Sequence, residues 1–176
     1  MRTEALDRIK LIFTLLDTDG SGQLEAGDFE LMGRNVVAAA PEAGDAAKQA
    51  MLDAFRKYWT TLATELDANS DGKVSFEEYQ ACVFSPERFD DTIATFAQAL
   101  AAMGDPDGDG LIERPVFTAL MTAIGFGAEN IGNLFDAFEP DSQDRVTVRI
   151  WVKGIKDYYG PEKAGVAGDH LVPAPA

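Results

Sequence analysis

The chain has 176 residues, 46% of them hydrophobic and 11 of them phenylalanine, which is enough for a packed core. A formal net charge of −15 argues against nucleic acid or an anionic membrane surface as a partner, because both carry negative charge themselves. The chain has a single cysteine, Cys82, which excludes an intramolecular disulfide. Its single histidine, His170, argues against a histidine-based zinc site and against histidine-dependent nucleophilic catalysis.

The first half of the chain carries apolar residues at helical spacing. A first amphipathic helix is expected over residues 3–16, and no apolar signal region precedes it, so a cytoplasmic location is the default. A second helix should stop near Pro41, because proline cannot continue a helix. A longer third helix leads towards Leu66, and a fourth is expected from Phe76 to Phe84.

The second half opens with a strong helix start, in which Ser85 offers a capping hydroxyl and Pro86 occupies the first helical position. That helix should end at Gly104. No run of residues in the chain approaches the roughly 20 apolar residues that a membrane-spanning helix needs. The tail, rich in alanine, glycine and proline, is expected to be irregular over residues 161–176. Further helices are expected over residues 115–124, 131–138 and a last stretch to about Tyr159.

Four acidic stretches separate these helices, and they start at residues 17, 67, 105 and 139. The first two place oxygen-bearing side chains at loop positions 1, 3 and 5, a glycine at position 6, an aliphatic residue at position 8 and a carboxylate at position 12. One continuous loop surrounds a calcium ion in this way, with hard oxygen ligands, a sharp turn and a closing acid. Two occurrences at the same offsets argue against coincidence.

The first two loops offer complete sets of calcium ligands, in which position 7 contributes its backbone carbonyl. Asp28 closes the first loop and is one methylene shorter than the usual glutamate, which favours weaker binding or tolerance of magnesium. The alternative for this loop is an acidic helix cap without a metal. The expected ligands are Asp17, Asp19, Ser21, Gln23 and Asp28 in the first loop, and Asp67, Asn69, Asp71, Lys73 and Glu78 in the second.

The third and fourth stretches are incomplete. Position 12 of the third loop is Val116, which cannot bind a metal, so a loosely held cation and an empty loop kept for pairing are both open. The fourth has Asp144 where glycine belongs and Ile150 at position 12, and a structural role is expected for it. The tentative ligands of the third loop are Asp105, Asp107, Asp109, Leu111 and Glu113.

Helix–loop–helix units of this kind work in pairs, because the extended segment at position 8 needs a partner strand. Leu24 should therefore pair with Val74, and Ile112 with Val146. The sequence predicts an all-α fold in which the short link between the pairs holds both in one compact globule. The expected divisions are an N-terminal pair at residues 1–84, a C-terminal pair at residues 85–160 and the tail at residues 161–176.

With these loops, the chain resembles the EF-hand proteins, and more narrowly the calerythrin and sarcoplasmic calcium-binding protein family. The resemblance covers nearly the whole chain, and residues 6–29, LDRIKLIFTLLDTDGSGQLEAGDF, are similar to the opening hand of bacterial calerythrins. It implies a compact calcium-buffering protein whose apolar faces turn inward, with the two ligand sets given above. Members usually keep three working loops, and Val116 departs from that pattern.

Two functions remain open. The first hypothesis is intracellular calcium buffering or storage by a monomer that is not an enzyme, with magnesium as a competitor. The alternative is a calcium sensor that exposes an apolar groove and regulates a partner protein. Sensors often line such a groove with flexible methionines, and this chain offers a scattered set, which favours the buffer. The available methionines are Met32, Met51, Met103 and Met121.

Overall fold

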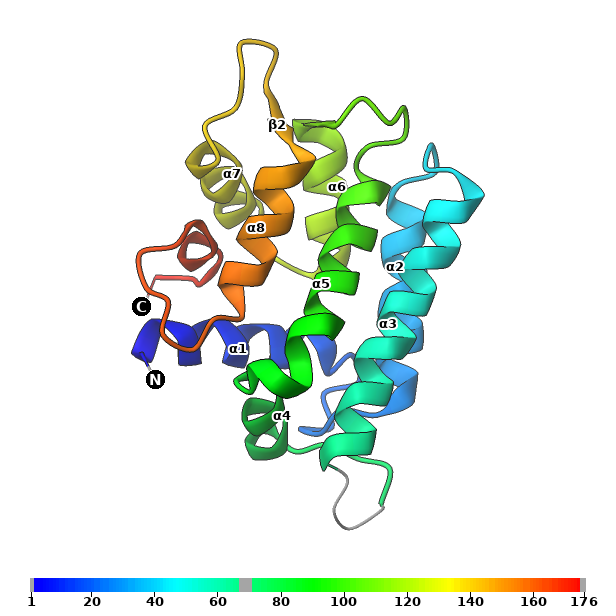
Figure 1. Ribbon diagram of the computed structural model, residues 1–176, viewed down its shortest axis with the longest axis vertical. Coiled ribbons are helices and arrows are strands. Elements are labelled where there is room, and N and C mark those ends of the chain that lie inside the picture. The colour runs from blue at the N-terminus through cyan, green and yellow to red at the C-terminus, as the bar shows by residue number, and fades with distance from the viewer. Residues whose placement is uncertain (1, 67–70, 175–176) are drawn as a thin grey trace.

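The computed structural model describes residues 2–66 and 71–174, which form a mostly helical body with a two-stranded sheet (Figure 1). No helix in this part of the chain combines the length and the apolarity needed to cross a membrane. The elements in chain order are α1 (Thr3–Leu16), α2 (Ala26–Ala39), α3 (Asp45–Leu66), α4 (Phe76–Val83), α5 (Pro86–Met103), β1 (Leu111–Glu113), α6 (Arg114–Ile124), α7 (Ala128–Ala137), β2 (Arg145–Thr147), α8 (Val148–Tyr158) and the 3-10 helix η1 (Ala167–Leu171).

The helix–loop–helix units pair as the sequence predicts. Leu24 and Val74 exchange two backbone hydrogen bonds of 2.9 Å, which makes the first pair. In the second pair, β1 and β2 run antiparallel with Ile112 opposite Val146. The pairs face opposite ends of the molecule, since α4 lies at the lower end of Figure 1 and β2 at the upper end. Both predicted partnerships are therefore confirmed.

The helix boundaries follow from local chemistry. The Ser75 hydroxyl accepts a hydrogen bond from the Glu78 N–H at 3.3 Å, while Glu78 Oε2 accepts one from the Ser75 N–H at 2.8 Å, so a capping box starts α4. Pro86 is the first residue of α5, where its missing N–H costs nothing. Gly125, in the left-handed region at φ 114°, ends α6.

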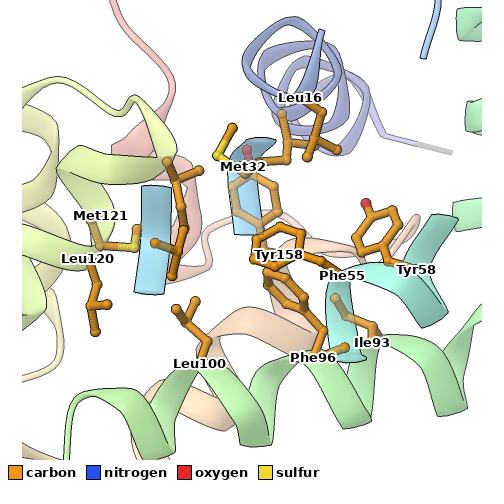
Figure 2. Close-up of a cluster of buried hydrophobic side chains, with 14 of the residues drawn as sticks. Leu16, Met32, Phe55, Tyr58, Ile93, Phe96, Leu100, Leu120, Met121 and Tyr158 are labelled. Atoms are coloured by element: carbon orange, nitrogen blue, oxygen red, sulfur yellow. The ribbon is translucent and has the colours of Figure 1, made fainter. Parts of the chain in front are cut away.

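The two pairs share one hydrophobic core. Leu16 and Met32 from the N-terminal pair meet Leu100 and Met121 from the C-terminal pair, and all four are buried (Figure 2). Burying one such side chain stabilises the fold by about 1.5–3 kcal/mol. The contact between the two pairs is extended by the packing of α3 against α5 and of α2 against α6. The link between the pairs is short, since only two residues separate α4 from α5. The chain is therefore one body, as predicted.

A cluster of buried tyrosine hydroxyls adds a polar link between the pairs. Tyr58 on α3 lies 2.6 Å from the Tyr79 hydroxyl on α4, and it donates to the Tyr159 hydroxyl at 3.2 Å, directly after α8. Burial raises the pKa of all three phenols, that of Tyr159 to about 12, so they remain protonated and able to donate. The end of the chain's last long helix is thereby tied to the second hand.

The C-terminal tail corrects the sequence prediction. An irregular tail was expected over residues 161–176, but residues 167–171 form η1, which packs against α7, α8 and α1. Leu171 is buried in the core, and the Asn130 side chain on α7 donates to the His170 carbonyl at 2.7 Å. The tail therefore contributes to the fold.

Arg8 gives the physical reason for this docking. Its side chain is 0% exposed on the apolar face of α1, and a buried cation must find partners. Asp169 pairs with one guanidinium nitrogen, and Nε donates to the Tyr158 carbonyl at 2.7 Å. Nη2 donates to the carbonyls of Gly160 at 3.0 Å and Lys163 at 3.1 Å. The tail folds back because it supplies these acceptors.

Candidate metal centre

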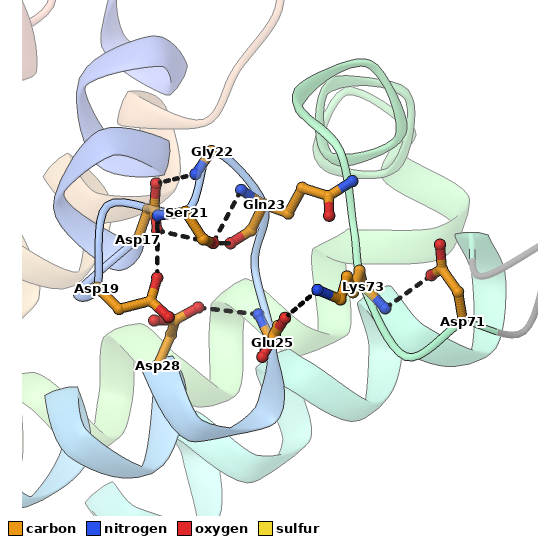
Figure 3. Close-up of polar contacts among 9 residues, drawn as sticks. All are labelled: Asp17, Asp19, Ser21, Gly22, Gln23, Glu25, Asp28, Asp71 and Lys73. Atoms are coloured by element: carbon orange, nitrogen blue, oxygen red, sulfur yellow. Dashed lines mark hydrogen bonds and ion pairs between the residues drawn. The ribbon is translucent and has the colours of Figure 1, made fainter.

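The first loop, between α1 and α2, fixes its first acid by backbone donors. Asp17 Oδ1 accepts from the Ser21 N–H at 2.9 Å, and Asp17 Oδ2 accepts from the Gly22 N–H at 2.8 Å (Figure 3). The turn that brings these N–H groups round depends on Gly22, which lies in the left-handed region at φ 83°. The carboxylate at position 1 is therefore held in place by the loop itself.

Asp28 is held just as firmly at position 12. Its side chain belongs to a residue only 4% exposed, and its Oδ1 accepts from the N–H of Thr18 at 3.1 Å and from the Thr18 hydroxyl at 2.7 Å. Its Oδ2 accepts from the Glu25 N–H at 2.9 Å. These three donors compensate a buried acid, and the part of Thr18 in this arrangement was missed by the sequence reasoning.

The predicted ligands of the first loop come together in space. Carboxylate oxygens of Asp17, Asp19 and Asp28 lie within 4.8 Å of one another. The Ser21 hydroxyl lies 2.9 Å from the Gln23 carbonyl oxygen and 3.4 Å from Asp17 Oδ1. The pKa of Asp19 is lowered, chiefly because the Ser21 N–H donates to its carboxylate. This set of hard oxygens suits a divalent cation such as calcium.

The second loop is described from Asp71 onwards, and the predicted ligands Asp67 and Asn69 lie outside the described residues. Asp71 Oδ1 accepts from the Lys73 N–H at 2.9 Å, while Glu78 at position 12 takes part in the capping box of α4. The Lys73 ammonium pairs with Glu25 at 2.9 Å (Figure 3). The two loops are thus joined by an ion pair as well as by the backbone bridge.

The third loop gathers acids without a closing ligand. Carboxylate oxygens of Asp105, Asp107 and Asp109 lie within 4.8 Å of one another. The pKa of Asp105 is raised, first by burial and also by the neighbouring acids Asp107 and Asp109, which disfavour its ionised form. Val116 is half-buried against the core, and Glu113 is exposed in β1 opposite Arg145. The site therefore has three carboxylates and no ligating side chain at position 12, and Leu111 lies in the adjoining strand β1.

In the fourth loop, arginines neutralise the acids. Asp144, at φ 61°, adopts the left-handed conformation that its position demands. Arg114 donates to both Asp144 oxygens, at 2.7 and 2.8 Å, and to Asp136 at 2.6 Å, while Arg145 pairs with Asp141 at 2.9 Å. These arginines lower the pKa values of Asp141 and Asp144. In the fourth loop, arginine side chains thus take the place that a metal ion would have beside these acids. The pairing of Arg114 with Asp144 was not predicted from the sequence.

Comparison with known proteins agrees with this geometry. Residues 6–84 match the sequence model of the EF-hand domain pair. Calerythrin of Saccharopolyspora erythraea is 26% identical, over 88% of this chain and 92% of its own. A Streptomyces coelicolor calcium-binding protein of solved structure superposes with a TM-score of 0.71 at 24% identity, covering 97% of this chain and 99% of its own.

A sarcoplasmic calcium-binding protein from amphioxus has the same fold, with a TM-score of 0.69 at 19% identity over 99% of this chain and 100% of its own. The paired loops, the shared core and the sequence similarity all agree with an EF-hand architecture. Residues 6–84 are therefore an EF-hand domain pair, and the chain as a whole resembles the calerythrin and sarcoplasmic calcium-binding protein family.

Proposed function

We propose that this protein binds calcium ions at the first two loops and buffers or stores the ion inside the cell. The observation that carries the proposal is the convergence of the carboxylates of Asp17, Asp19 and Asp28, each held by hydrogen bonds from its own loop. A cation placed among them would relieve their mutual repulsion. In the second loop, Glu78 would leave its capping position to close the site.

The other loops are assigned weaker roles. Three carboxylates of the third loop would hold a calcium ion loosely, with Glu113 or water completing its shell, because Val116 offers no ligand. The short reach of Asp28 lets magnesium compete at the first loop. The fourth loop serves as the structural partner of the third.

Buffering is favoured over sensing because the apolar faces are already used within the molecule. Met32, Met51 and Met121 are buried in the core. Among the side chains of residues 2–64 and 71–174, the large apolar ones left exposed are Leu31 at 40% and Ile150 at 36%. The sensor remains the alternative, since the Streptomyces coelicolor protein is described in terms of calcium-mediated regulation. We propose a cytoplasmic monomer.

Calorimetric titration of the metal-free protein tests the number of sites. We expect two calcium ions to bind tightly per chain and a third to bind at least about tenfold more weakly, because the third loop has no acid at position 12. Magnesium present at millimolar concentration should weaken the first loop more than the second. A stoichiometry below two, with the protein shown to be folded, would contradict the proposal.

Binding of an apolar dye separates the buffer from the sensor. We expect the fluorescence of anilinonaphthalene sulfonate to change less than about twofold when calcium is added to saturation, because little apolar surface becomes accessible. Calmodulin, a sensor whose hydrophobic groove opens on calcium binding, serves as the positive control. A rise of calmodulin's size in this protein would establish the sensor alternative.

A further inference from the structure

The Lys73 side chain reaches from the second loop to the first. Its ammonium lies 2.9 Å from Glu25 Oε1, and the antiparallel bridge between Leu24 and Val74 places the two residues opposite each other. Glu25 is position 9 of the first loop, and in calcium loops this position supplies a ligand directly or through a water molecule. A cation of the chain itself is therefore paired with a carboxylate that a metal ion in the first loop would use.

Glu25 stands apart from the acids that gather in its own loop. Within the described residues, carboxylate oxygens of Asp17, Asp19 and Asp28 form a group whose members lie within 4.8 Å of one another, and Glu25 is not a member. Figure 3 shows the Glu25 carboxylate directed towards Lys73, between the two loops. The acid at position 9 thus serves the lysine of the second loop and not the carboxylate group of the first.

This ion pair is weak enough for a metal ion to displace it. The Lys73 side chain is 46% exposed and the Glu25 side chain 39% exposed. The strength of such solvated pairs corresponds to at most about a fivefold change in an equilibrium constant. A divalent ion bound in the first loop can therefore take Glu25 from Lys73, but its affinity is reduced by the free energy that breaking the pair requires.

Calcium and magnesium differ in how much they need Glu25. Calcium takes six to eight oxygen ligands, whereas the smaller magnesium ion keeps several waters and needs only one or two carboxylates. Withholding one carboxylate therefore costs calcium a ligand that magnesium replaces with water. The positive charge of Lys73 repels both ions alike, because both carry two charges. A change in the ratio of the two affinities thus separates the withholding of a ligand from simple repulsion.

We propose that Lys73 is a specificity-determining residue of the first loop, which lowers the affinity for calcium more than the affinity for magnesium by holding Glu25 away. This role rests on the metal binding proposed for that loop. It acts in the same direction as the short side chain of Asp28 at position 12. The backbone carbonyl of Lys73 is a predicted ligand of the second loop, so one residue serves one loop with its backbone and the other with its side chain.

The Lys73→Met substitution tests this role, because it removes the ammonium and keeps the backbone carbonyl. It is made in a Glu78→Ala background of the full chain, in which the first loop is the tightest remaining site. Separate calorimetric titrations with calcium and with magnesium give the two affinities. The NMR signal of the Gly22 amide identifies the loop that fills, since this N–H donates to Asp17 Oδ2 at 2.8 Å. We expect Lys73→Met to raise the calcium affinity about fivefold and the magnesium affinity less than about twofold.

Two controls are made in the same Glu78→Ala background. Lys10→Met removes an exposed positive charge from α1, outside both loops, and should leave the ratio of the two affinities unchanged. Glu25→Gln removes the carboxylate for which the lysine and the metal compete. Adding Lys73→Met to Glu25→Gln should therefore no longer change the ratio, because no carboxylate is released.

The outcomes separate this role from the calcium binding on which it rests. Circular dichroism checks that each variant is folded, and Lys73→Gln replaces Lys73→Met if the latter does not fold. An unchanged calcium affinity, equal gains for both ions, or a gain in the ratio that persists in the Glu25→Gln protein would overturn the role of Lys73 alone. If the Gly22 amide of the folded Glu78→Ala protein does not respond to calcium, the proposed function of the first loop fails as well.

Discussion

Replacing Glu78 by alanine is expected to remove one tightly bound calcium ion from the chain's stoichiometry. Glu78 stands at position 12 of the second loop, where a glutamate closes the shell with both carboxylate oxygens. Losing them should weaken that site about 100-fold or more, which corresponds to roughly 2.7 kcal/mol of binding free energy. Calorimetric titration of the variant and the original protein measures the change.

The neighbouring Glu77→Ala provides the matched control. Both substitutions remove one negative charge from the first turn of α4, but the Glu77 side chain is exposed and lies one position before the closing ligand. We expect Glu77→Ala to keep the full stoichiometry. Glu78 also caps α4, so the Glu78→Ala protein should lose about 1 kcal/mol of stability without calcium. Equal titration curves for both variants would refute the assignment of the second loop.

The Asp169→Ala substitution is expected to lower the free energy of unfolding by about 3–5 kcal/mol. It leaves the fully buried guanidinium of Arg8 without its counter-charge, although three backbone carbonyls still accept from it. The tail should also loosen, because the ion pair holds η1 against α1. Urea denaturation at saturating calcium measures the loss.

An exposed ion pair supplies the comparison for this result. Asp91 pairs with Lys57 at 2.5 Å, but the Asp91 side chain is 91% exposed. Asp91→Ala removes the same kind of group from a solvated position, and it should cost about 0–1 kcal/mol. If both variants lose equally little, Arg8 does not depend on Asp169 and the tail is held by its apolar contacts instead.

Most of the fold was predictable because its signals are local. Apolar residues at helical spacing and the start signal at Ser85 and Pro86 gave the helices to within a few residues. The strand partners followed from position 8 of each loop, so Leu24 met Val74 as predicted. The tail could not be predicted in this way, because its structure depends on Arg8, 161 residues away from Asp169 in the sequence.

In the candidate site too, the residues given by local sequence spacing were predictable, and the contacts set by the tertiary fold were not. Loop spacing places Asp17, Asp19 and Asp28 around one point, and the structure agrees. The basic side chains that pair with acids of a neighbouring loop were missed, because these pairings are not part of the repeating ligand pattern. Lys73 reaches Glu25 of the other loop, and Arg114 occupies the fourth loop from a helix of the third hand. Charges in such places are visible in the sequence, but their partners are set by the tertiary fold.

The contact between the two ends of the chain constrains how the protein is made. The Arg2 N–H donates to the Pro161 carbonyl at 3.1 Å, and Arg8 finds its partners only in the last residues. A ribosome synthesises α1 well before the tail, so Arg8 on the buried face of α1 has no Asp169 to pair with until 161 further residues have been added. The native packing of the first hand is therefore completed only after translation has delivered the tail.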